Sequence, residues 1–423
     1  MQAKTIAAIE SAVDELKDEL FGLAQELIRI PSVVGHEGDA QEFIARRYAE
    51  AGLKVEFFEA DKDAVKRHPA FIDSGIPFAG RPNVIARRPG DPKKRSLILN
   101  GHIDVVSPEP MDQWRHDPWG GHIENGRLYG RGSVDMKAGL AANFIALKAL
   151  ERAGVDPGGS VILQSVIEEE AGGGGGTLAC LLRGYVADAM FFTEPGPGIC
   201  ISHAGILYFR VRVKGLTAHA GRAHEGVNAI EKMYNVFNAL FELDKHRRAT
   251  VSYPLFQAKG TPACHLNLGR MTAGDWPSTV PGFAELEGRI SFVPGETKAD
   301  IKSLVEKTVK ETALADPWLR DHPPTIEWFG WQTEPWQQNP EHPFVKTVGE
   351  VVAEITGRKA DMIGKPAGLD TRFAALLDIP AISFGPIGES SHGCNEYVDL
   401  DSLVMATKVV AVSTLSWCSQ AKD

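Results

Sequence analysis

Short apolar runs alternate with helix-like segments through most of this chain of 423 residues, and this alternation constrains the fold more than any other feature. Apolar runs of strand length lie at 97–100, 161–167, 189–193 and 381–384. Segments with helical spacing lie between them, including 136–153 and 343–355. This alternation is typical of βαβ units on a mostly parallel sheet.

The pattern changes after Gly205. Residues 206–213 alternate with a period of two, a long helix is expected at 226–243, and further strands and one helix follow. The α/β pattern then resumes with the helix at 343–355. The sequence therefore predicts an α/β fold: a mostly parallel-sheet domain formed by residues 1–204 and 332–423, with an inserted α+β sandwich domain at 205–331.

Charge and cysteine usage exclude several classes of protein. The net charge is −10, from 45 basic and 55 acidic residues, and the longest basic cluster is the short run 93–95, so we expect no nucleic-acid partner. We find no stretch of the ~20 apolar residues that a membrane helix needs, and the acidic N-terminus does not resemble a signal peptide. Five scattered cysteines without a CxxC pair indicate reduced thiols, so we expect a cytoplasmic protein.

Residues that can bind metal follow the apolar runs. In chain order they are His102 and Asp104, the acidic run Glu168–Glu170, Glu194, and His392. Asp135 comes just before the helix that starts at Met136. Because ligands bind at the carboxyl ends of parallel strands, we expect these side chains to meet at one edge of the sheet.

Two histidines with several carboxylates suit Zn²⁺ and tolerate Co²⁺ or Mn²⁺. One acid could bridge two ions, and Asp104 could accept the free ring N–H of His102. Three adjacent acids at 168–170 repel one another, so a solvated surface turn is an alternative. The apolar run before them and the five glycines at 172–176 weaken that alternative.

A further motif lies in the inserted domain. It reads GLTAHAG at 215–221, followed by GVNAI at 226–230. On the residues alone, a strand–turn–helix with glycine in the turn and asparagine as the helix cap explains it as well as a functional site does. The pattern by itself therefore gives His219 no catalytic role.

Taken together, these motifs resemble the metallopeptidase family that contains acetylornithine deacetylase, succinyl-diaminopimelate desuccinylase, aminoacylase and glutamate carboxypeptidase. The matching motifs, in the family's order, are GHIDVV (101–106), YGRGSVDMKAG (129–139), EEEAGG (168–173), TEP (193–195), GLTAHAG with GVNAI, FGP (384–386) and SHGCNEYV (391–398). The resemblance covers nearly the whole chain.

The resemblance implies a centre of two divalent metal ions, with Zn²⁺ first and Co²⁺ or Mn²⁺ as alternatives. It implies that His102 and Glu194 bind one ion and that Glu170 and His392 bind the other. It also implies that Asp135 bridges the two ions and often precedes a cis peptide.

The resemblance also implies roles outside the ligand set. Glu169 would be the general base, and Asp104 the partner of His102. His219 would reach the active site of a partner subunit and polarise the scissile carbonyl. A homodimer formed through the inserted domain follows from that role.

The function implied is metal-dependent hydrolysis of the amide bond in small N-acyl amino acids or dipeptide-like substrates. Two alternatives remain open: removal of an amine from a small aromatic acid, and a non-catalytic metal-binding paralogue. Ser278 and Ser291 stand where relatives carry asparagine and a carboxylate-binding arginine, so recognition of a substrate carboxylate stays open. The candidate substrate-binding residues are Asn228, Arg289 and Arg372.

Overall fold

The computed structural model describes residues 3–257 and 260–422. The chain forms two compact units. The first contains the chain up to Ile201, then Gln338–Met362, and the chain from Leu369 onward; the second contains Ser202–Gln337 and Ile363–Gly368. The expected domain boundaries near 205 and 331 remain predictions.

The first unit is built on a large mixed sheet, in which its strands follow the order β1-β2-β6-β3-β7-β15-β8. Its strands are β1 (Lys54–Phe58), β2 (Asn83–Arg88), β3 (Leu97–His102), β6 (Val161–Val166), β7 (Met190–Phe192), β8 (Ile199–His203), whose last two residues belong to the second unit, and β15 (Ala381–Ser383). The centre, β6-β3-β7-β15, is parallel, whereas β1 and β2 at one edge are antiparallel. The predicted mostly parallel core is confirmed.

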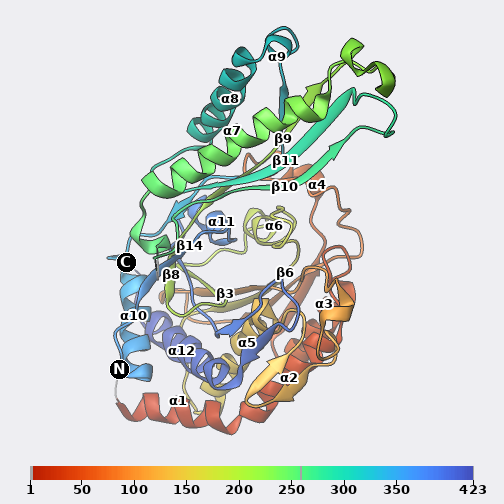
Figure 1. The fold of residues 1–423 in the computed structure, drawn as a ribbon. Helices are drawn as coiled ribbons and strands as arrows, with labels where there is room; N and C mark the ends of the chain where they lie inside the picture. Colours follow the sequence, from red (N-terminus) through yellow and green to blue (C-terminus); the bar gives the residue numbers. More distant parts are fainter. Residues whose placement is uncertain (1–2, 258–259, 423) are drawn as a thin grey trace. The chain divides into compact units, whose positions relative to one another are not determined.

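Helices cover both faces of this sheet, with α5 and α12 on one face and α6 and α11 on the other (Figure 1). The helices of the unit are α1 (Ala3–Glu15), α2 (Lys17–Arg29), α3 (Gly38–Glu50), α4 (Lys62–Val65), α5 (Ala138–Arg152), α6 (Thr177–Leu182), α10 (Pro343–Thr356), α11 (Thr371–Ala375) and α12 (Leu400–Cys418), with the short turns η1 (Met111–Gln113) and η2 (Ser133–Lys137). Every residue of β3, β6 and β7 is buried, as expected for strands covered on both sides.

Helix α12 is long and apolar enough to span a membrane by length and composition. This helix does not form one continuous apolar stretch in the sequence, because polar residues such as Lys408 interrupt it. In the structure 72% of its most apolar window is buried, and it packs against α5, α10 and α1. Such burial is typical of a core helix.

A small antiparallel sheet in the first unit has the order β16-β17-β5-β4. Its strands are β4 (His122–Glu124), β5 (Arg127–Tyr129), β16 (Gly388–Glu389) and β17 (Tyr397–Asp399). The loop that carries His392 connects β16 to β17. This sheet therefore fixes both ends of that loop.

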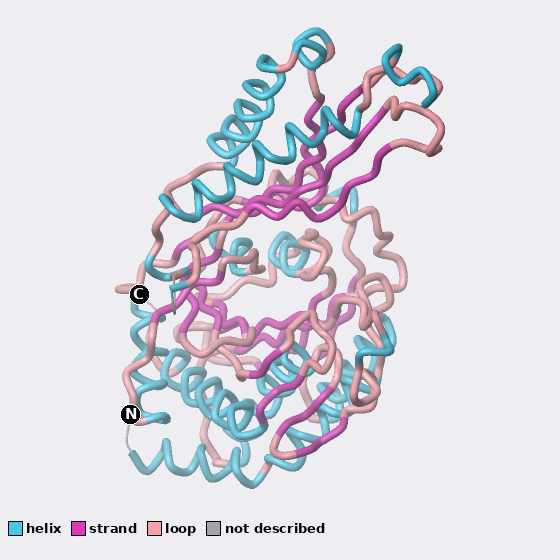
Figure 2. Tube along the Cα trace, in the orientation of Figure 1, coloured by secondary structure: helices cyan, strands magenta, loops and turns pink. Residues whose placement is uncertain are grey.

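The second unit is an antiparallel sheet of order β10-β11-β9-β12 with helices on one face (Figure 2). Its elements are β9 (Gly205–Lys214), η3 (Ala220–Glu225), α7 (Ala229–Thr250), η4 (Pro254–Phe256), β10 (Leu266–Ala273), β11 (Phe283–Phe292), α8 (Lys298–Ala315), α9 (Pro317–Asp321), β12 (Thr325–Thr333), β13 (Trp336–Gln337) and all of β14 (Met362–Lys365) but its first residue. Buried and less buried residues alternate along β9, and its buried side chains pack on α7 and α8. The expected α+β sandwich is confirmed.

Candidate metal centre

The predicted ligands meet at the carboxyl edge of the parallel strands in the first unit. His102 is the last residue of β3, Glu169 and Glu170 follow β6, and Glu194 follows β7. His392 comes from the loop after β16, and Asp135 lies within η2 at the start of α5. Parallel pairing of β3 with β6 and β7 aligns the strand ends, which explains the convergence.

Asp135 lies between the two histidines. Its Oδ1 is 3.3 Å from Nε2 of His102, and its Oδ2 is 3.5 Å from Nε2 of His392. The hydroxyl of Ser391 donates to Oδ2 at 2.7 Å. The peptide between Asp135 and Met136 is cis, as the resemblance implied. One carboxylate thus presents a separate oxygen to each of two imidazoles.

Each histidine also faces a carboxylate of its own. Nε2 of His102 is 3.5 Å from Oε1 of Glu194, and Nε2 of His392 is 2.9 Å from Oε2 of Glu170. These contacts define two triplets that share Asp135. Nitrogen and oxygen donors at this spacing suit Zn²⁺, whose bonds to them are about 2.0–2.2 Å long.

The charges of the cluster attract protons in the absence of metal. Burial opposes protonation of His102, but Asp135 and Glu194 raise its pKa well above the usual value. Asp135 and Glu170 raise the pKa of His392 to about 10. Burial, together with the charge of Glu194, raises the pKa of Glu169 well above its ordinary value. The site therefore favours positive charge at its centre.

Asp104 supports this cluster differently from the expectation. Nδ1 of His102 is 2.9 Å from the main-chain oxygen of Asp104 and 3.7 Å from its carboxylate, so the predicted carboxylate contact is wrong in this detail. The buried carboxylate instead accepts from the N–H groups of Glu169 and Glu170, at 3.3 and 3.1 Å. A carbonyl partner keeps the proton on Nδ1 and leaves the Nε2 lone pair for a metal.

Glu168 has different partners from the two acids that follow it, which relieves part of the repulsion within the acidic run. Glu168, with a left-handed backbone (φ 70°), accepts from the Ser74 hydroxyl and from the Gly175 N–H at 2.8 Å. Glu169 and Glu170 turn toward the histidines. The alternative of a solvated surface turn is wrong, because Glu168 and Glu169 are buried.

The five glycines after the acids allow the backbone to enclose Glu168. A Cβ on Gly173 would lie 2.3 Å from the Glu168 carboxylate, and one on Gly175 would lie 2.7 Å from it. Arg81 lies 3.9 Å from Glu168 and forms a two-pronged pair with Glu37, with both N–O distances 2.6 Å. Sequence reasoning missed Arg81 and Glu37, because no motif links them to the acidic run.

Comparison with known proteins identifies the family. Residues 98–414 match the model of peptidase family M20/M25/M40. The chain belongs to this family.

Among relatives, an N-formyl-4-amino-5-aminomethyl-2-methylpyrimidine deformylase of Halalkalibacterium halodurans is 29% identical over 97% of both chains. A succinyl-diaminopimelate desuccinylase of Methylorubrum populi is 30% identical, covering 90% of this chain and 95% of the relative. An M20 family metallo-carboxypeptidase structure from Sulfolobus solfataricus superposes with a TM-score of 0.72 at 18% identity, covering 95% of this chain and 99% of that one. The resemblance inferred from the motifs is confirmed, and this M20 family member is a metal-dependent hydrolase of amide bonds in small substrates.

A second buried carboxylate in this M20 protein positions Asp135. Glu396 accepts from the N–H groups of Gly132, Val134 and Asp135 at 3.0–3.1 Å. Nη1 of Arg131 donates to Glu396 at 2.7 Å, and both side chains are buried. Sequence reasoning missed this pair, although both residues lie within the quoted motifs, because nothing local to either shows that they meet.

Arg372, a candidate for substrate binding, contacts the backbone beside the cluster. It is buried and donates to the carbonyl oxygens of Leu369 and Gly172 at 2.9 and 3.2 Å, and lies 3.5 Å from Asp370. Burial lowers the pKa of its guanidinium. These contacts suit a residue that positions the turn after Glu170, and its substrate role stays a prediction.

The other three predicted residues belong to the second unit. Asn228 caps α7, because its Oδ1 accepts from the N–H of Ile230 at 2.9 Å. Arg289 lies on β11 opposite Tyr208 of β9, and burial lowers its pKa. His219 is exposed, and its Nδ1 accepts from the Gly221 N–H at 3.0 Å. Their roles toward a substrate stay predictions.

Proposed function

We propose that the first unit binds two divalent metal ions through a shared Asp135. His102 and Glu194 would complete the ligands of one ion, and Glu170 and His392 those of the other. The observation that carries this proposal is the aim of the two Asp135 oxygens at two different histidines, each with its own carboxylate. A bridging carboxylate is the arrangement expected when two ions lie about 3.5–4 Å apart.

When bound, such ions polarise an amide carbonyl and make a water molecule more acidic. Glu169 would accept the proton of that water and deliver it to the leaving nitrogen. Its raised pKa suits this task, because a group that must both take and release a proton works best near the operating pH. Asp104 holds the Glu169 backbone and so orients the base.

His219 would donate a hydrogen bond to the oxygen of the scissile carbonyl in a partner subunit. Because its Nδ1 accepts from Gly221, a neutral His219 carries its proton on Nε2, the form that can donate to an oxyanion. The exposed side of α7 supports a homodimer formed through the second unit. There Ile230, Tyr234 and Phe241 are 45%, 62% and 43% exposed at helical spacing.

For the substrate, we propose a small N-acylated amine without a carboxylate, rather than an N-acyl amino acid. Ser291, where relatives carry the carboxylate-binding arginine, is buried and bonded to the backbone of His265. The similarity to the pyrimidine deformylase extends over nearly the whole of both chains. An N-acyl amino acid with Arg289 or Arg372 as its carboxylate partner is the second candidate, supported by the desuccinylase relative.

A matched substrate panel tests both. N-formyl, N-acetyl and N-succinyl derivatives of an aminomethylpyrimidine would be compared with the same acyl groups on amino acids, together with dipeptides. Enzyme depleted of metal and reloaded with Zn²⁺, Co²⁺ or Mn²⁺ would be used throughout. The proposal expects the highest kcat/KM with an acylated aminomethylpyrimidine. A preference of more than tenfold for acylated amino acids would replace it with the second candidate.

The assembly and location are proposed as a cytoplasmic homodimer. The five cysteines are free thiols, which suits a reducing compartment. Substituting Tyr234→Lys together with Phe241→Glu should shift the enzyme from dimer to monomer in sedimentation velocity. A mass unchanged by both substitutions would place the interface elsewhere.

A further inference from the structure

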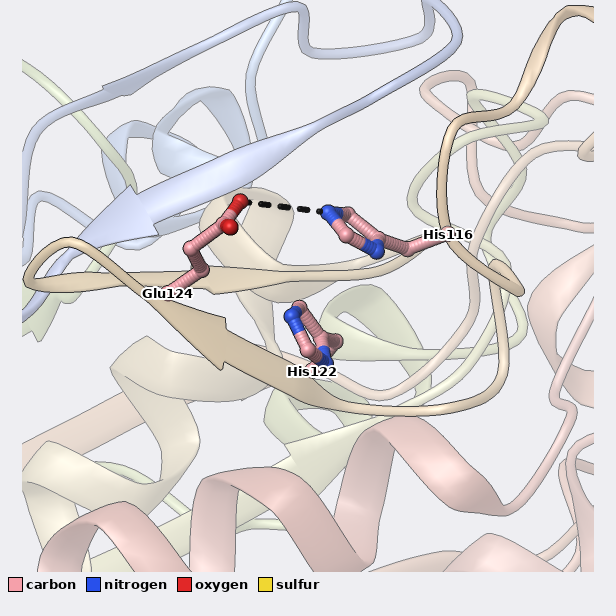
Figure 3. Close-up of side chains that lie close together, drawn as sticks. All are labelled: His116, His122 and Glu124. Atoms are coloured by element: carbon pink, nitrogen blue, oxygen red, sulfur yellow. Dashed lines mark ion pairs between the residues drawn. The ribbon is translucent and has the colours of Figure 1, made fainter.

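A second group of histidines with a carboxylate lies outside the centre described above. His122 and Glu124 stand two residues apart on β4, so they share one face of the strand, and His116 lies in the loop that precedes it. Figure 3 shows the carboxylate of Glu124 facing the ring of His116, with the ring of His122 beside them. One ligand atom from each residue lies within 4.8 Å of the others.

His116 has a donor or acceptor atom that the protein leaves unused. Its Nε2 is buried and, in the described part of the chain, has no hydrogen-bond partner. The nearest carboxylate oxygen, Oε2 of Glu124, is 3.6 Å away, which is too long for a hydrogen bond. A buried polar atom without a partner is costly, so this atom indicates a ligand that would satisfy it.

The spacing fits a metal ion better than an internal contact. In a tetrahedral zinc site with bonds of about 2.0–2.1 Å, ligand atoms are separated by about 3.4 Å, close to the 3.6 Å between His116 and Glu124. The rings of His116 and His122 are stacked with centroids 4.0 Å apart, and His122 is exposed, so a rotation of its side chain can bring its nitrogen to the same point. We propose that His116, His122 and Glu124 form an additional divalent-metal site of the zinc class.

Arg127, the cation paired across the strands with Glu124, does not compete strongly for this carboxylate. Its guanidinium lies over the ring of Tyr397, 4.3 Å from the centroid. Glu124 therefore keeps its negative charge available for a cation. Two imidazoles and one carboxylate, completed by a water molecule, are a donor set that Zn²⁺ accepts.

The site joins two segments that lead to His392. The loop of His116 is bonded to the loop of His392: the Arg115 N–H donates to Oδ1 of Asn395 at 2.6 Å, and Nδ2 of Asn395 donates to the Gln113 carbonyl at 3.0 Å. On the other side, β5 pairs β4 with β17, which follows the same loop. An ion bound by His116, His122 and Glu124 would therefore connect the 107–121 loop to the β4–β5 hairpin. This connection would stabilise the position of the chain around Asn395.

The test counts zinc ions on the metal-loaded enzyme. Native mass spectrometry and titration against a chromogenic chelator would compare the wild type with His122→Ala and Glu124→Gln, both exposed positions where folding is not at risk. We expect the wild type to bind one more zinc ion than either variant, or to bind it at least about tenfold more tightly. Zinc beyond the ions of the buried centre should raise Tm in the wild type but not in the variants.

His246→Ala provides the matched control, because His246 is an exposed histidine on α7 in the second unit. It should bind as many ions as the wild type. Equal zinc counts and equal affinities in the wild type, His122→Ala and Glu124→Gln would overturn the proposal. The wild type and the variants share the centre around Asp135. The difference in their zinc counts therefore tests the proposed site regardless of whether that centre binds one ion or two.

Discussion

Two sets of carboxylates in the first unit differ in their counter-charges. Glu396 and Glu37 each meet an arginine, Arg131 or Arg81, at distances of 2.6–2.7 Å. Asp135 and Glu170, by contrast, face the imidazole of His392, and Asp135 also faces His102. The first set is neutralised by permanent cations of the chain, whereas the second faces groups that are cations only when protonated.

This difference in counter-charge distinguishes carboxylates with a structural role from carboxylates of the proposed metal centre. An arginine that is always charged makes a buried carboxylate a fixed part of the structure. Imidazoles with pKa values raised by surrounding carboxylates mark a place where positive charge is needed and can be exchanged. A divalent ion supplies that charge and releases the histidine protons. The predictions below test this division.

The largest effect is expected from Glu169→Gln. The amide keeps the shape of the side chain but cannot take a proton, so kcat should fall by about 10²–10⁴-fold while metal content stays near that of the wild type. Steady-state kinetics and metal analysis by mass spectrometry measure the two quantities. Loss of metal in this variant would move the base role to another residue.

Glu168→Gln is the matched control for that experiment, one residue away. Its carboxylate faces Ser74, Gly175 and Arg81, so the change should lower the stability of the glycine turn and leave the chemistry in place. We expect a drop in Tm with kcat within about tenfold of the wild type. A loss of kcat as large as that of Glu169→Gln would mean that the acids act as one unit.

Removal of metal should reduce activity by more than about a hundredfold, with recovery on adding Zn²⁺, Co²⁺ or Mn²⁺. The depleted protein should also melt at a lower temperature, because a ligand at 100 times its Kd stabilises the folded state by about 2.7 kcal/mol. In Asp135→Asn both triplets lose their shared ligand, so this variant should fail to regain activity or Tm. Full recovery by Asp135→Asn would contradict the bridging role.

On the supporting side, Arg131→Met should lower the free energy of unfolding by about 3–5 kcal/mol, because it leaves Glu396 buried without its cation. Adding Glu396→Gln removes the orphaned charge and should restore part of the loss. Urea unfolding of metal-loaded protein measures both. Additive losses in the double variant would show that the two side chains do not act as a pair.

The sequence predicted that the candidate ligand side chains meet because they follow recognisable strands. His102, Glu194 and the acidic run each end an apolar segment, and parallel pairing brings such ends together. The support could not be predicted in the same way, because Arg131 and Glu396 are separated by 265 positions and Glu37 and Arg81 by 44. Single charged residues in loops carry no periodic signal, and only the folded chain shows that they pair.

The sequence also did not predict which oxygen of Asp104 accepts the hydrogen bond from His102. The sequence placed the Asp104 carboxylate against His102, whereas the main-chain oxygen of Asp104 takes that position. The carboxylate turns instead to the N–H groups of Glu169 and Glu170, which the left-handed turn at Glu168 directs toward it. The pattern of residue types cannot distinguish these two acceptors of one residue.

The smallest effect is expected at Asp316 in the second unit, whose pKa is shifted in the opposite direction to that of Glu169. Burial alone would raise the pKa of Asp316, but the N–H groups of Leu319 and Trp318 and the ammonium of Lys232 outweigh it and lower the pKa. Asp316→Asn keeps the helix cap and removes the charge, so it should cost about 0.5 kcal/mol at pH 7.

Because the folded-state pKa of Asp316 lies below the unfolded one, its contribution is present above about pH 4 and is lost as the pH falls through the folded value. The stability difference between wild type and Asp316→Asn, measured by urea unfolding, should therefore shrink below pH 4. A stability difference that grows on acidification would mean that the pKa of Asp316 is raised, as that of Glu169 is. The distinction between carboxylates paired with Arg or Lys and carboxylates at the proposed metal centre would then not apply to the second unit.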